Sequence, residues 1–442
     1  MKNYFYKLLF KYLSLYIFTT DKLVSIFPVT NNLLSQFPQG KVVIDDSIIK
    51  NCGNGITNER LGINEIKTYD PDYIMVNGTL HYIRDVQKLL EQLSRQCHSH
   101  TRLIITHYSS LWKPIMRLAT FLGFCKSMQE GNWLSHEDVN NLLLLSDFEI
   151  IHSESRVLSP LYFPLLSDLI NRYISPLPFF RAFNLVNIVV ARPVPVAPAL
   201  SPQSSVSVVV AARNEEGNIE NIIKRLPQMG PDDELIIIEG NSTDNTWQKI
   251  QEVYEKNKNR INIQIGQQEG HGKGDAVRKG FEMAQKDILM ILDADLTVPP
   301  EDLPKFYKVI VSGKGEYING SRLVYPMEEK AMRFFNIIGN KFFAIAFSFV
   351  LGQRFKDTLC GTKVITKKNY QKLAAHREYF GNFDPFGDFD LIFGSARMCL
   401  KIVELPVRYR ERTYGETNIS RWSHGLILLK MLFFAARKIK FI

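Results

Sequence analysis

Two acidic residues stand one position apart directly after an apolar run that is typical of a buried strand. The run is Ile288–Leu292, and the acids are Asp293 and Asp295. Carboxylate oxygens suit hard cations such as Mg²⁺ or Mn²⁺, and a cation held there would also grip a diphosphate and stabilise it as a leaving group. A solvated acidic turn would explain the same short motif. The polar loops described next favour the interpretation as a metal site over the acidic turn.

Three further loops carry residues that could bind a nucleotide. The segments 211–216 and 239–244 each follow an apolar run, and their acids and amides could contact a base and a ribose. The segment 270–274 precedes a helical pattern, so its glycines allow close approach of a phosphate and Lys273 adds positive charge at a helix N-terminus. An ordinary turn explains any one of these loops. Four polar loops at the ends of successive strands indicate a binding site.

The elements that must position these loops alternate between strand and helix. Apolar runs and helical spacing predict strands at 206–211, 235–238, 261–265 and 288–292, with helices near 219–226, 247–254 and 275–285. Asp244 is placed to help cap the second of these helices. The alternation predicts an α/β fold with a mostly parallel sheet, whose ligands bind beyond the carboxyl ends of the strands.

The first half of the chain shows a second α/β pattern. Strands are predicted at 73–76, 103–106, 148–151 and 185–191, with a helix at 84–96. The Pro- and Ser-rich stretch Arg192–Ser205 is the best candidate for a linker. We therefore expect five parts: a basic aromatic N-terminal helix (1–36), a first α/β domain (37–192), a linker (193–204), a second α/β domain (205–424) and a basic amphipathic C-terminal helix (425–442).

Composition narrows the function less than the motifs do. The 442 residues carry a formal net charge of +9, which fits nucleic acid, an anionic membrane or a phosphorylated substrate equally well. The basic residues are dispersed without aromatic patterning, which argues against nucleic acid. The 5 cysteines are scattered, which indicates a reducing compartment. No signal-peptide pattern and no spanning run of roughly 18–20 apolar residues stands out.

Residues 205–325 resemble the nucleotide-binding half of family-2 glycosyltransferases with the GT-A fold, and more closely the polyprenyl-phosphate or dolichyl-phosphate sugar transferases. The resemblance implies inverting transfer from a UDP- or GDP-linked sugar with Mg²⁺ or Mn²⁺. It assigns Asp293 and Asp295 to the metal, with Asp293 also facing the donor. It assigns the nucleotide sugar to Asn214, Glu215, Glu239, Asp244 and Lys273.

The similarity continues through four segments towards the C-terminus: 319–322, 357–363, 386–390 and 410–418. It implies that three arginines serve the phosphate of a lipid acceptor, namely Arg322, Arg333 and Arg412. It also implies an acceptor-side role for Asp388 and Asp390.

The chain departs from the family pattern at three positions. Thr297 stands where these enzymes often have Gln, and Asn418 stands where they have Lys. Both departures leave metal binding intact and leave the acceptor open. Glu239 replaces the usual Asp, which keeps the charge at the nucleotide site.

Two segments indicate a membrane surface. Met332–Leu351 resembles the interfacial helices of the lipid-phosphate enzymes, with aromatic residues expected at the lipid boundary: Phe334, Phe335, Phe342, Phe343, Phe347 and Phe349. His424–Ile442 mixes apolar residues with Lys430, Arg437, Lys438 and Lys440, which fits either a core helix with a solvated end or a basic membrane anchor. We expect a peripheral protein at the cytoplasmic face of the membrane that binds no nucleic acid.

Residues 41–192 resemble a class I S-adenosylmethionine methyltransferase whose cofactor end is damaged. Lys41–Asp45 matches the first strand of that fold, but Asp46–Ile48 follows where the family has glycines, so the backbone cannot approach the cofactor. Too few residues separate Asp45 from Asp72 for two further strand–helix units. We therefore expect a partial Rossmann-like remnant without methyl transfer.

Three functions remain open at this point. The first is sugar transfer to a polyprenyl phosphate, and the second is sugar transfer to a soluble hydroxyl acceptor. The third is a non-catalytic interaction protein built on two inactive enzyme folds, which the intact D-x-D motif and Lys273 disfavour.

Overall fold

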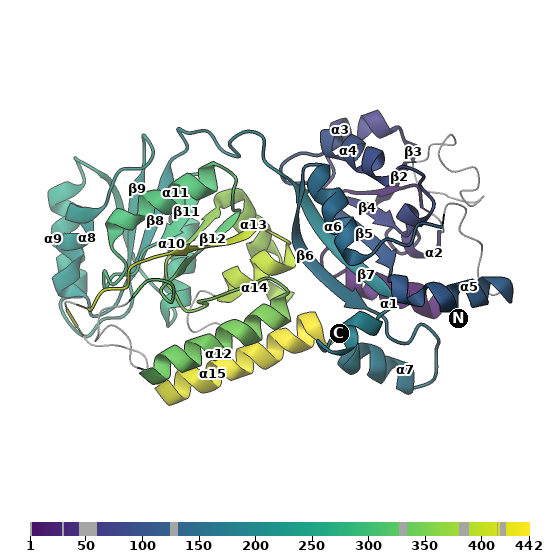
Figure 1. The fold of residues 1–442 in the computed structure, drawn as a ribbon. Helices are drawn as coiled ribbons and strands as arrows, with labels where there is room; N and C mark the ends of the chain where they lie inside the picture. Colours follow the sequence, from purple (N-terminus) through teal and green to yellow (C-terminus); the bar gives the residue numbers. More distant parts are fainter. Residues whose placement is uncertain are drawn as a thin grey trace. The chain divides into compact units, whose positions relative to one another are not determined.

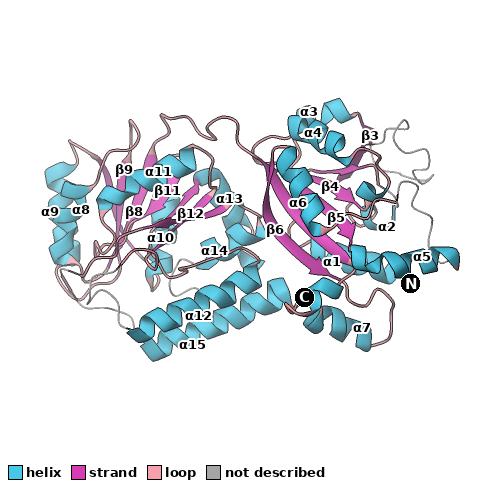
Figure 2. Ribbon diagram, viewed as in Figure 1, coloured by secondary structure: helices cyan, strands magenta, loops and turns pink. Residues whose placement is uncertain are grey.

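The computed structural model describes residues 2–28, 31–43, 60–123, 131–326, 334–379, 389–412, 414–415 and 421–442. The chain divides into two compact units, each with its own seven-stranded sheet (Figure 1). Unit 1 comprises Met1–Val194 with Ile439–Ile442, and unit 2 comprises Pro195–Lys438. Helices flank both sheets (Figure 2), which confirms the predicted α/β class.

The sheet of unit 1 has the strand order β3-β2-β1-β4-β5-β7-β6. Its first five strands run parallel, and β7 is antiparallel to both of its neighbours. This is a doubly wound order, in which the winding reverses between β1 and β4. The strands are β1 Leu23–Ile26, β2 Gly40–Val43, β3 Arg60–Leu61, β4 Tyr73–Asn77, β5 Arg102–Tyr108, β6 Phe148–Arg156 and β7 Val186–Pro193.

The expectation of a partial sheet that begins at Lys41–Asp45 is wrong. The first strand is Leu23–Ile26, which is fully buried and pairs with β2 on one side and β4 on the other. With β2 at Gly40–Val43 and β3 at Arg60–Leu61, the two strands that we expected to be missing are present. The run of β1 has only 4 residues, which is too short to show strand periodicity, and it falls within the range 1–36 that we expected to be an N-terminal helix. The predicted replacement of glycines at Asp46–Ile48 lies outside the described residues.

The helices of unit 1 cover both faces of its sheet. In α4 the residues Val86, Leu89, Leu90 and Leu93 are all buried, and the side chain of Asp85 caps its first turn. This confirms the helix predicted from the spacing of those residues. The helices are α1 Lys2–Leu13, α2 Asn31–Leu34, α3 Ile66–Tyr69, α4 Val86–Gln96, α5 Lys113–Phe121, α6 His136–Leu145 and α7 Leu166–Leu169.

A buried ion cluster joins β6 to the last residues of the chain within unit 1. Arg156 Nε donates to Glu154 at 2.9 Å, and Arg156 Nη1 donates to the carbonyl of Lys440 at 2.8 Å. Burial lowers the pKa of Lys440 to about 8. Burial opposes ionisation of Glu154, yet the charge of Arg156 holds the pKa of that carboxyl well below its ordinary value. Lys440 is therefore a buried residue, and the expectation that it lies on a membrane-facing surface is wrong.

We expect Arg156→Met to lower the free energy of unfolding by about 3–5 kcal/mol, because it leaves the buried Glu154 without its main counter-charge. Urea denaturation of the full chain measures the change. Arg437→Met, at an exposed position, is the matched control and should change stability by less than about 0.5 kcal/mol. A loss below about 1 kcal/mol in Arg156→Met would show that the cluster contributes little.

The sheet of unit 2 has the strand order β10-β9-β8-β11-β13-β12-β14. The strands β10, β9, β8 and β11 run parallel, as predicted, and β13 is antiparallel to both β11 and β12. The strands are β8 Val206–Ala212, β9 Glu234–Glu239, β10 Asn262–Gln267, β11 Ile288–Ile291, β12 Tyr317–Ser321, β13 Lys363–Thr366 and β14 Ile402–Pro406.

Helices pack closely on this second sheet. Gly280 brings α10 against β8, because a Cβ there would lie 2.3 Å from Cγ1 of Val209. The pair α12 and α15 lies side by side along one border of the unit (Figure 1). The helices are α8 Ile219–Arg225, α9 Thr246–Asn257, α10 Lys273–Met283, α11 Leu303–Val311, α12 Phe334–Leu351, α13 Lys367–Ala375, α14 Phe389–Arg397 and α15 Arg421–Ala435.

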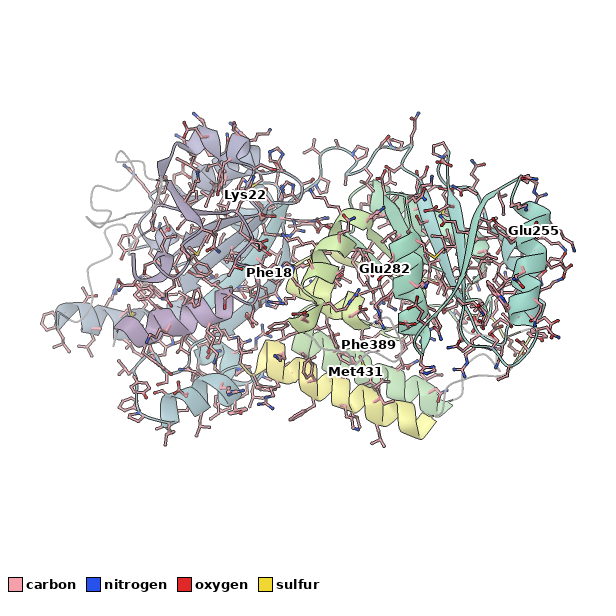
Figure 3. All side chains as sticks on the ribbon, turned by 180° about the vertical axis from the view of Figure 1, so that it is seen from behind. Phe18, Lys22, Glu255, Glu282, Phe389 and Met431 are labelled. Atoms are coloured by element: carbon pink, nitrogen blue, oxygen red, sulfur yellow. The ribbon has the colours of Figure 1, made fainter. Side chains whose placement is uncertain are left out.

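The aromatic residues of α12 do not share one environment. Phe343 and Phe347 are buried, and the ring of Phe347 lies 5.2 Å from that of Phe389, which Figure 3 labels next to the helix pair. The expectation that Phe343 and Phe347 lie at a lipid boundary is therefore wrong, whereas Phe342 is half exposed. Among the helices that the structure describes, none is long and apolar enough to cross a membrane.

Candidate active site

The polar loops predicted to bind a nucleotide follow strands that are direct neighbours in the sheet. The strands β8, β9 and β11 run parallel, so their carboxyl ends meet at one edge. The backbone N–H of Gly240 donates to the carbonyl of Ala212 at 2.8 Å, which joins the loops after β8 and β9. This is the edge at which open α/β sheets bind ligands.

Asn214 links the loops after β8 and β9. It adopts a left-handed backbone conformation with φ 56°, which Asn tolerates better than most residues. Its Oδ1 accepts from the backbone N–H of Thr243 at 2.8 Å, and its own N–H donates to Ser242 Oγ at 3.1 Å. Asn214, which was predicted to bind the nucleotide, therefore holds together the two loops that carry most of the predicted nucleotide-binding residues.

Two further predicted nucleotide residues organise the loop after β9. Glu239 is buried and accepts from the backbone N–H of Ser242 at 2.5 Å and from Gln267 Nε2 at 3.0 Å. Asp244 Oδ1 accepts from the backbone N–H of Thr246, the first residue of α9, at 3.0 Å. The N-cap position of this helix is Asn245, so Asp244 holds the turn that leads into the helix. These two carboxylates therefore shape the loop after β9 through hydrogen bonds to its own backbone.

Lys273 and Asp293 form the first of two ion pairs at the D-x-D motif. Lys273, the first residue of α10, donates to Asp293 Oδ1 at 2.6 Å. Burial raises the pKa of the Asp293 carboxyl, but the charge of Lys273 outweighs it and holds that pKa below its ordinary value. Gly361 faces the same carboxylate so closely that a Cβ there would lie 2.1 Å from Asp293 Oδ2. A side chain at 361 would occupy the space around this carboxylate.

Arg412 forms the second ion pair and bridges two carboxylates. Its Nη1 donates to Glu215 at 2.9 Å, and its Nη2 donates to Asp295 Oδ2 at 2.7 Å. Burial raises the pKa of the Glu215 carboxyl to about 7, against the opposing charge of Arg412. Thr297, which departs from the family pattern, donates through its hydroxyl to Asp295 Oδ1 at 2.8 Å.

The carboxylates of the D-x-D motif suit a hard divalent cation. Both are now neutralised by a cationic side chain, Asp293 by Lys273 and Asp295 by Arg412. Within the described part of the chain, no group of three or more His, Cys, Asp or Glu residues gathers that could hold a metal. Two carboxylates with donor phosphates and water are a normal ligand set for Mg²⁺. The residues present therefore fit Mg²⁺ or Mn²⁺ bound together with a diphosphate.

Arg322, a predicted acceptor residue, is engaged by a carboxylate that the sequence did not single out. Its Nε and Nη2 donate to the two oxygens of Asp357 at 2.7 and 2.9 Å, and its guanidinium lies 5.1 Å from the ring centre of Tyr409. Asp357 is fully buried. Asp357 begins segment 357–363, which resembles the family, but nothing in the sequence pairs this residue with Arg322.

The other acceptor-side residues are described only in part. Asp390 lies in the first turn of α14 and accepts from Arg377 Nε at 3.2 Å, while Arg377 Nη2 donates to the hydroxyl of Tyr370 at 3.0 Å. Arg333 and Asp388 lie outside the described residues.

Tyr414 is a residue near the nucleotide loops to which the sequence assigned no role. Its ring lies against Gly217, where a Cβ would come within 2.5 Å of the ring. Gly217 follows the loop after β8, so the segment that carries Arg412 also packs on that loop. In the sequence, the glycine that directly follows segment 211–216 could have indicated that another segment packs closely there.

A family model described as Glycosyl transferase family 2 matches residues 207–374, which lie wholly within unit 2. The C-terminal half of the chain thus contains a glycosyltransferase family 2 domain.

Several curated proteins resemble the chain. A dolichol-phosphate mannosyltransferase from Pyrococcus furiosus is 35% identical over 121 residues, which cover 27% of this chain and 33% of that protein. Glycosyltransferase AglJ from Haloferax volcanii is 26% identical over 53% of this chain and 72% of its own length. An undecaprenyl-phosphate 4-deoxy-4-formamido-L-arabinose transferase from Proteus mirabilis is 26% identical over 49% of this chain and 63% of its own length. The chain thus spans only about a third of the Pyrococcus relative and less than two thirds of the Proteus one.

Among solved structures, the chain is similar to glucosyl-3-phosphoglycerate synthase from Mycobacterium tuberculosis, determined in complex with Mn²⁺, uridine diphosphate and glucosyl-3-phosphoglycerate. The TM-score is 0.39 and the identity 18%, over 53% of this chain and 80% of the synthase chain.

Proposed function

We propose that the protein transfers a sugar, with inversion, from a nucleoside diphosphate sugar to a polyprenyl phosphate, with Mg²⁺ or Mn²⁺ as cofactor. The observation that carries the proposal is the pairing of Asp293 with Lys273 and of Asp295 with Arg412 at the carboxyl edge of the sheet. The family match to residues 207–374 and the activities for which the Pyrococcus and Proteus relatives are named support it.

On the donor side, Asp293 and Asp295 would hold the cation, which would supply charge stabilisation to the departing diphosphate. Lys273 then exchanges Asp293 for phosphate oxygens at the N-terminus of α10, where the helix dipole favours negative charge. Asn214, Glu239 and Asp244 keep the two loops in shape around the nucleoside.

On the acceptor side, arginine suits a phosphate because its planar fork donates two hydrogen bonds at once. Arg322 and Arg412 take this role, together with Arg333. A phosphate acceptor is already ionised near neutral pH, so the reaction needs little help from a general base. The carboxylates Asp388 and Asp390 are needed as bases only for a hydroxyl acceptor.

A lipid acceptor requires the site to work at a membrane surface, and we place it peripherally at the inner face of the cytoplasmic membrane. Exposed apolar and basic side chains of α12, α15 and the turn after α15 support this location. They include Phe342, Phe433, Lys430 and Arg437.

A thermal-shift screen of the full chain tests the donor assignment. UDP- and GDP-linked sugars are added with Mn²⁺, and one donor at about 100 times its dissociation constant should stabilise the protein by roughly 2.7 kcal/mol. EDTA should remove the shift. If no nucleotide sugar stabilises the protein in the presence of Mn²⁺, the proposal is wrong and the function of a non-catalytic interaction protein replaces it.

One observation favours a second candidate, transfer to a soluble hydroxyl acceptor. The fork of Arg322 is already occupied by the carboxylate of Asp357, so a phosphate would have to compete for it or share it. Comparison of the double variant Arg322→Gln, Asp357→Asn with Asp390→Asn separates the two acceptors.

We predict that unit 1 does not bind S-adenosylmethionine. At the carboxyl end of β1, Phe27 is fully buried directly after the strand, and Thr79 Oγ1 donates to the carbonyl of Ile26 at 3.1 Å. Ligands of doubly wound sheets bind at this position. Calorimetry on the full chain should give no heat with millimolar S-adenosylmethionine, with a nucleotide sugar and Mn²⁺ as the positive control. A micromolar dissociation constant would overturn the prediction.

A further inference from the structure

Unit 1 exposes many large apolar side chains on two segments. The first is α5 with its flanking residues, 111–122, and the second is the connection between β6 and β7, residues 159–183. Phe121, Leu165 and Phe179 have 86%, 79% and 74% of their surface exposed. We call these two segments together the carboxyl-edge surface. Soluble monomers rarely expose a large contiguous apolar area unless it serves binding.

The two segments lie at the same edge of the sheet. The strands β5 and β6 are both antiparallel to β7, so their carboxyl ends point the same way, and one segment follows each strand. Trp112 Nε1 donates to the carbonyl of Phe183 at 2.8 Å, which joins the start of the first segment to the end of the second. Figure 1 shows α5 and α7 at the same end of unit 1.

The N-terminal helix adds to this surface. The ring centre of Tyr4 in α1 lies 4.9 Å from that of Tyr162. Burial lowers the pKa of Lys11 in the same helix, and the nearby charge of Arg172 lowers it further, so these two cations are neighbours.

The charges of the carboxyl-edge surface are mostly positive. Its sequence contains Lys113, Arg117, Arg172 and Arg181, against the single acid Asp168. Asp168 accepts from the Tyr4 hydroxyl at 2.9 Å. Apolar and aromatic side chains combined with basic residues are typical of segments that lie in the interface of an anionic bilayer.

We propose that the carboxyl-edge surface of unit 1 binds the surface of an anionic lipid bilayer. Phe121, Leu165 and Phe179 enter the boundary between head groups and acyl chains, and Lys113 and Arg117 face the lipid phosphates. This inference goes beyond the proposed function, because it concerns the unit that does not hold the transferase site. It also does not depend on the identity of the acceptor.

Flotation of the full chain with vesicles tests the inference. The protein should float with vesicles of phosphatidylcholine and phosphatidylglycerol, and much less with phosphatidylcholine alone. The triple variant Leu118→Glu, Phe121→Glu, Leu165→Glu should lower the partition coefficient for the anionic vesicles at least about tenfold, since each side chain loses a favourable insertion. The three positions are exposed, so the fold should persist.

A matched control is available on α6. Leu144→Glu, Leu145→Glu changes two leucines that are 70% and 63% exposed, where α6 leads into the start of β6 and hence at the opposite end of the sheet. This variant should float like the unmodified protein.

Three outcomes would overturn the inference. The unmodified protein fails to float with anionic vesicles, or the triple variant floats equally well, or Phe433→Glu on α15 alone removes flotation. Light scattering adds a further overturning result, a homodimer that the triple variant abolishes, which would make the surface an interface between two copies. Donor hydrolysis by the triple variant should equal that of the unmodified protein, so a failure of the transferase assignment is recognised separately.

Discussion

Asp293→Asn and Asp295→Asn should each lower donor turnover about 100- to 1000-fold. Each change removes one of two carboxylates that are proposed to hold the cation at the diphosphate, and such charge stabilisation is worth several kcal/mol in the transition state, with about 1.4 kcal/mol for each factor of ten. Donor consumption in the presence of Mn²⁺ measures the effect. EDTA should abolish turnover of the unmodified protein, and added Mn²⁺ should restore it.

The control for these variants is Asp232→Asn, at an exposed aspartate that pairs with Lys286 in the same unit. Turnover should be unchanged, because Asp232 lies at the start of β9 rather than at the carboxyl edge. Circular dichroism should show that all three variants keep the fold. Full activity in EDTA would rule out the metal assignment, whatever the variants do.

Replacing the Arg322–Asp357 pair by a neutral pair should lower transfer to a polyprenyl phosphate about 100-fold or more. The double variant Arg322→Gln, Asp357→Asn removes the charged fork, and each hydrogen bond to a charged group is worth roughly 1.5–3 kcal/mol. Donor hydrolysis by water should survive, because the D-x-D motif is untouched. Asp390→Asn, and the corresponding Asp388→Asn, should reduce transfer only a few-fold.

The double variant is preferable to Arg322→Ala. Removal of the arginine side chain alone would leave the fully buried Asp357 without its counter-charge, at a cost of about 3–5 kcal/mol, and loss of folding would mimic loss of acceptor binding. Arg412→Ala is a weaker test of the acceptor, because Arg412 also contacts Glu215 and Asp295 on the donor side.

The opposite pattern would change the acceptor. Suppose that Asp388→Asn or Asp390→Asn abolishes transfer, while the double variant Arg322→Gln, Asp357→Asn lowers it only mildly. A base is then required to remove a proton during attack. The acceptor is then a hydroxyl, and the soluble-acceptor function replaces the lipid phosphate.

Much of unit 2 could be predicted from the sequence because its information is local. The apolar runs at β8, β9 and β11 are nearly continuous, as buried parallel strands are, whereas the edge strand β10 alternates isoleucine with polar residues. A polar loop follows each of these strands. Parallel neighbours bring those loops to one edge, so the meeting of Asn214 with the loop after β9 followed from the strand pattern. The D-x-D motif needed no tertiary contact to be recognised.

Only the tertiary structure decided which basic side chain forms an ion pair with each acidic side chain. Arg412 lies 117 residues from Asp295 and 197 from Glu215 in the chain, and local periodicity contains nothing about such pairings. The same holds for Arg322 with Asp357. It also holds for the burial of Phe347, because a helix that is apolar all round does not indicate which face meets α14.

The first unit shows the same division. The sequence by itself determined an α/β pattern and the strands from β4 onwards. The central place of β1 depended on pairing with β2 and β4, and a run of only four residues carries too little periodicity to reveal that pairing. Likewise Lys440 reads as a solvated basic residue in the sequence. It is buried because the chain end returns to Glu154 and Arg156, and only long-range packing could supply those partners.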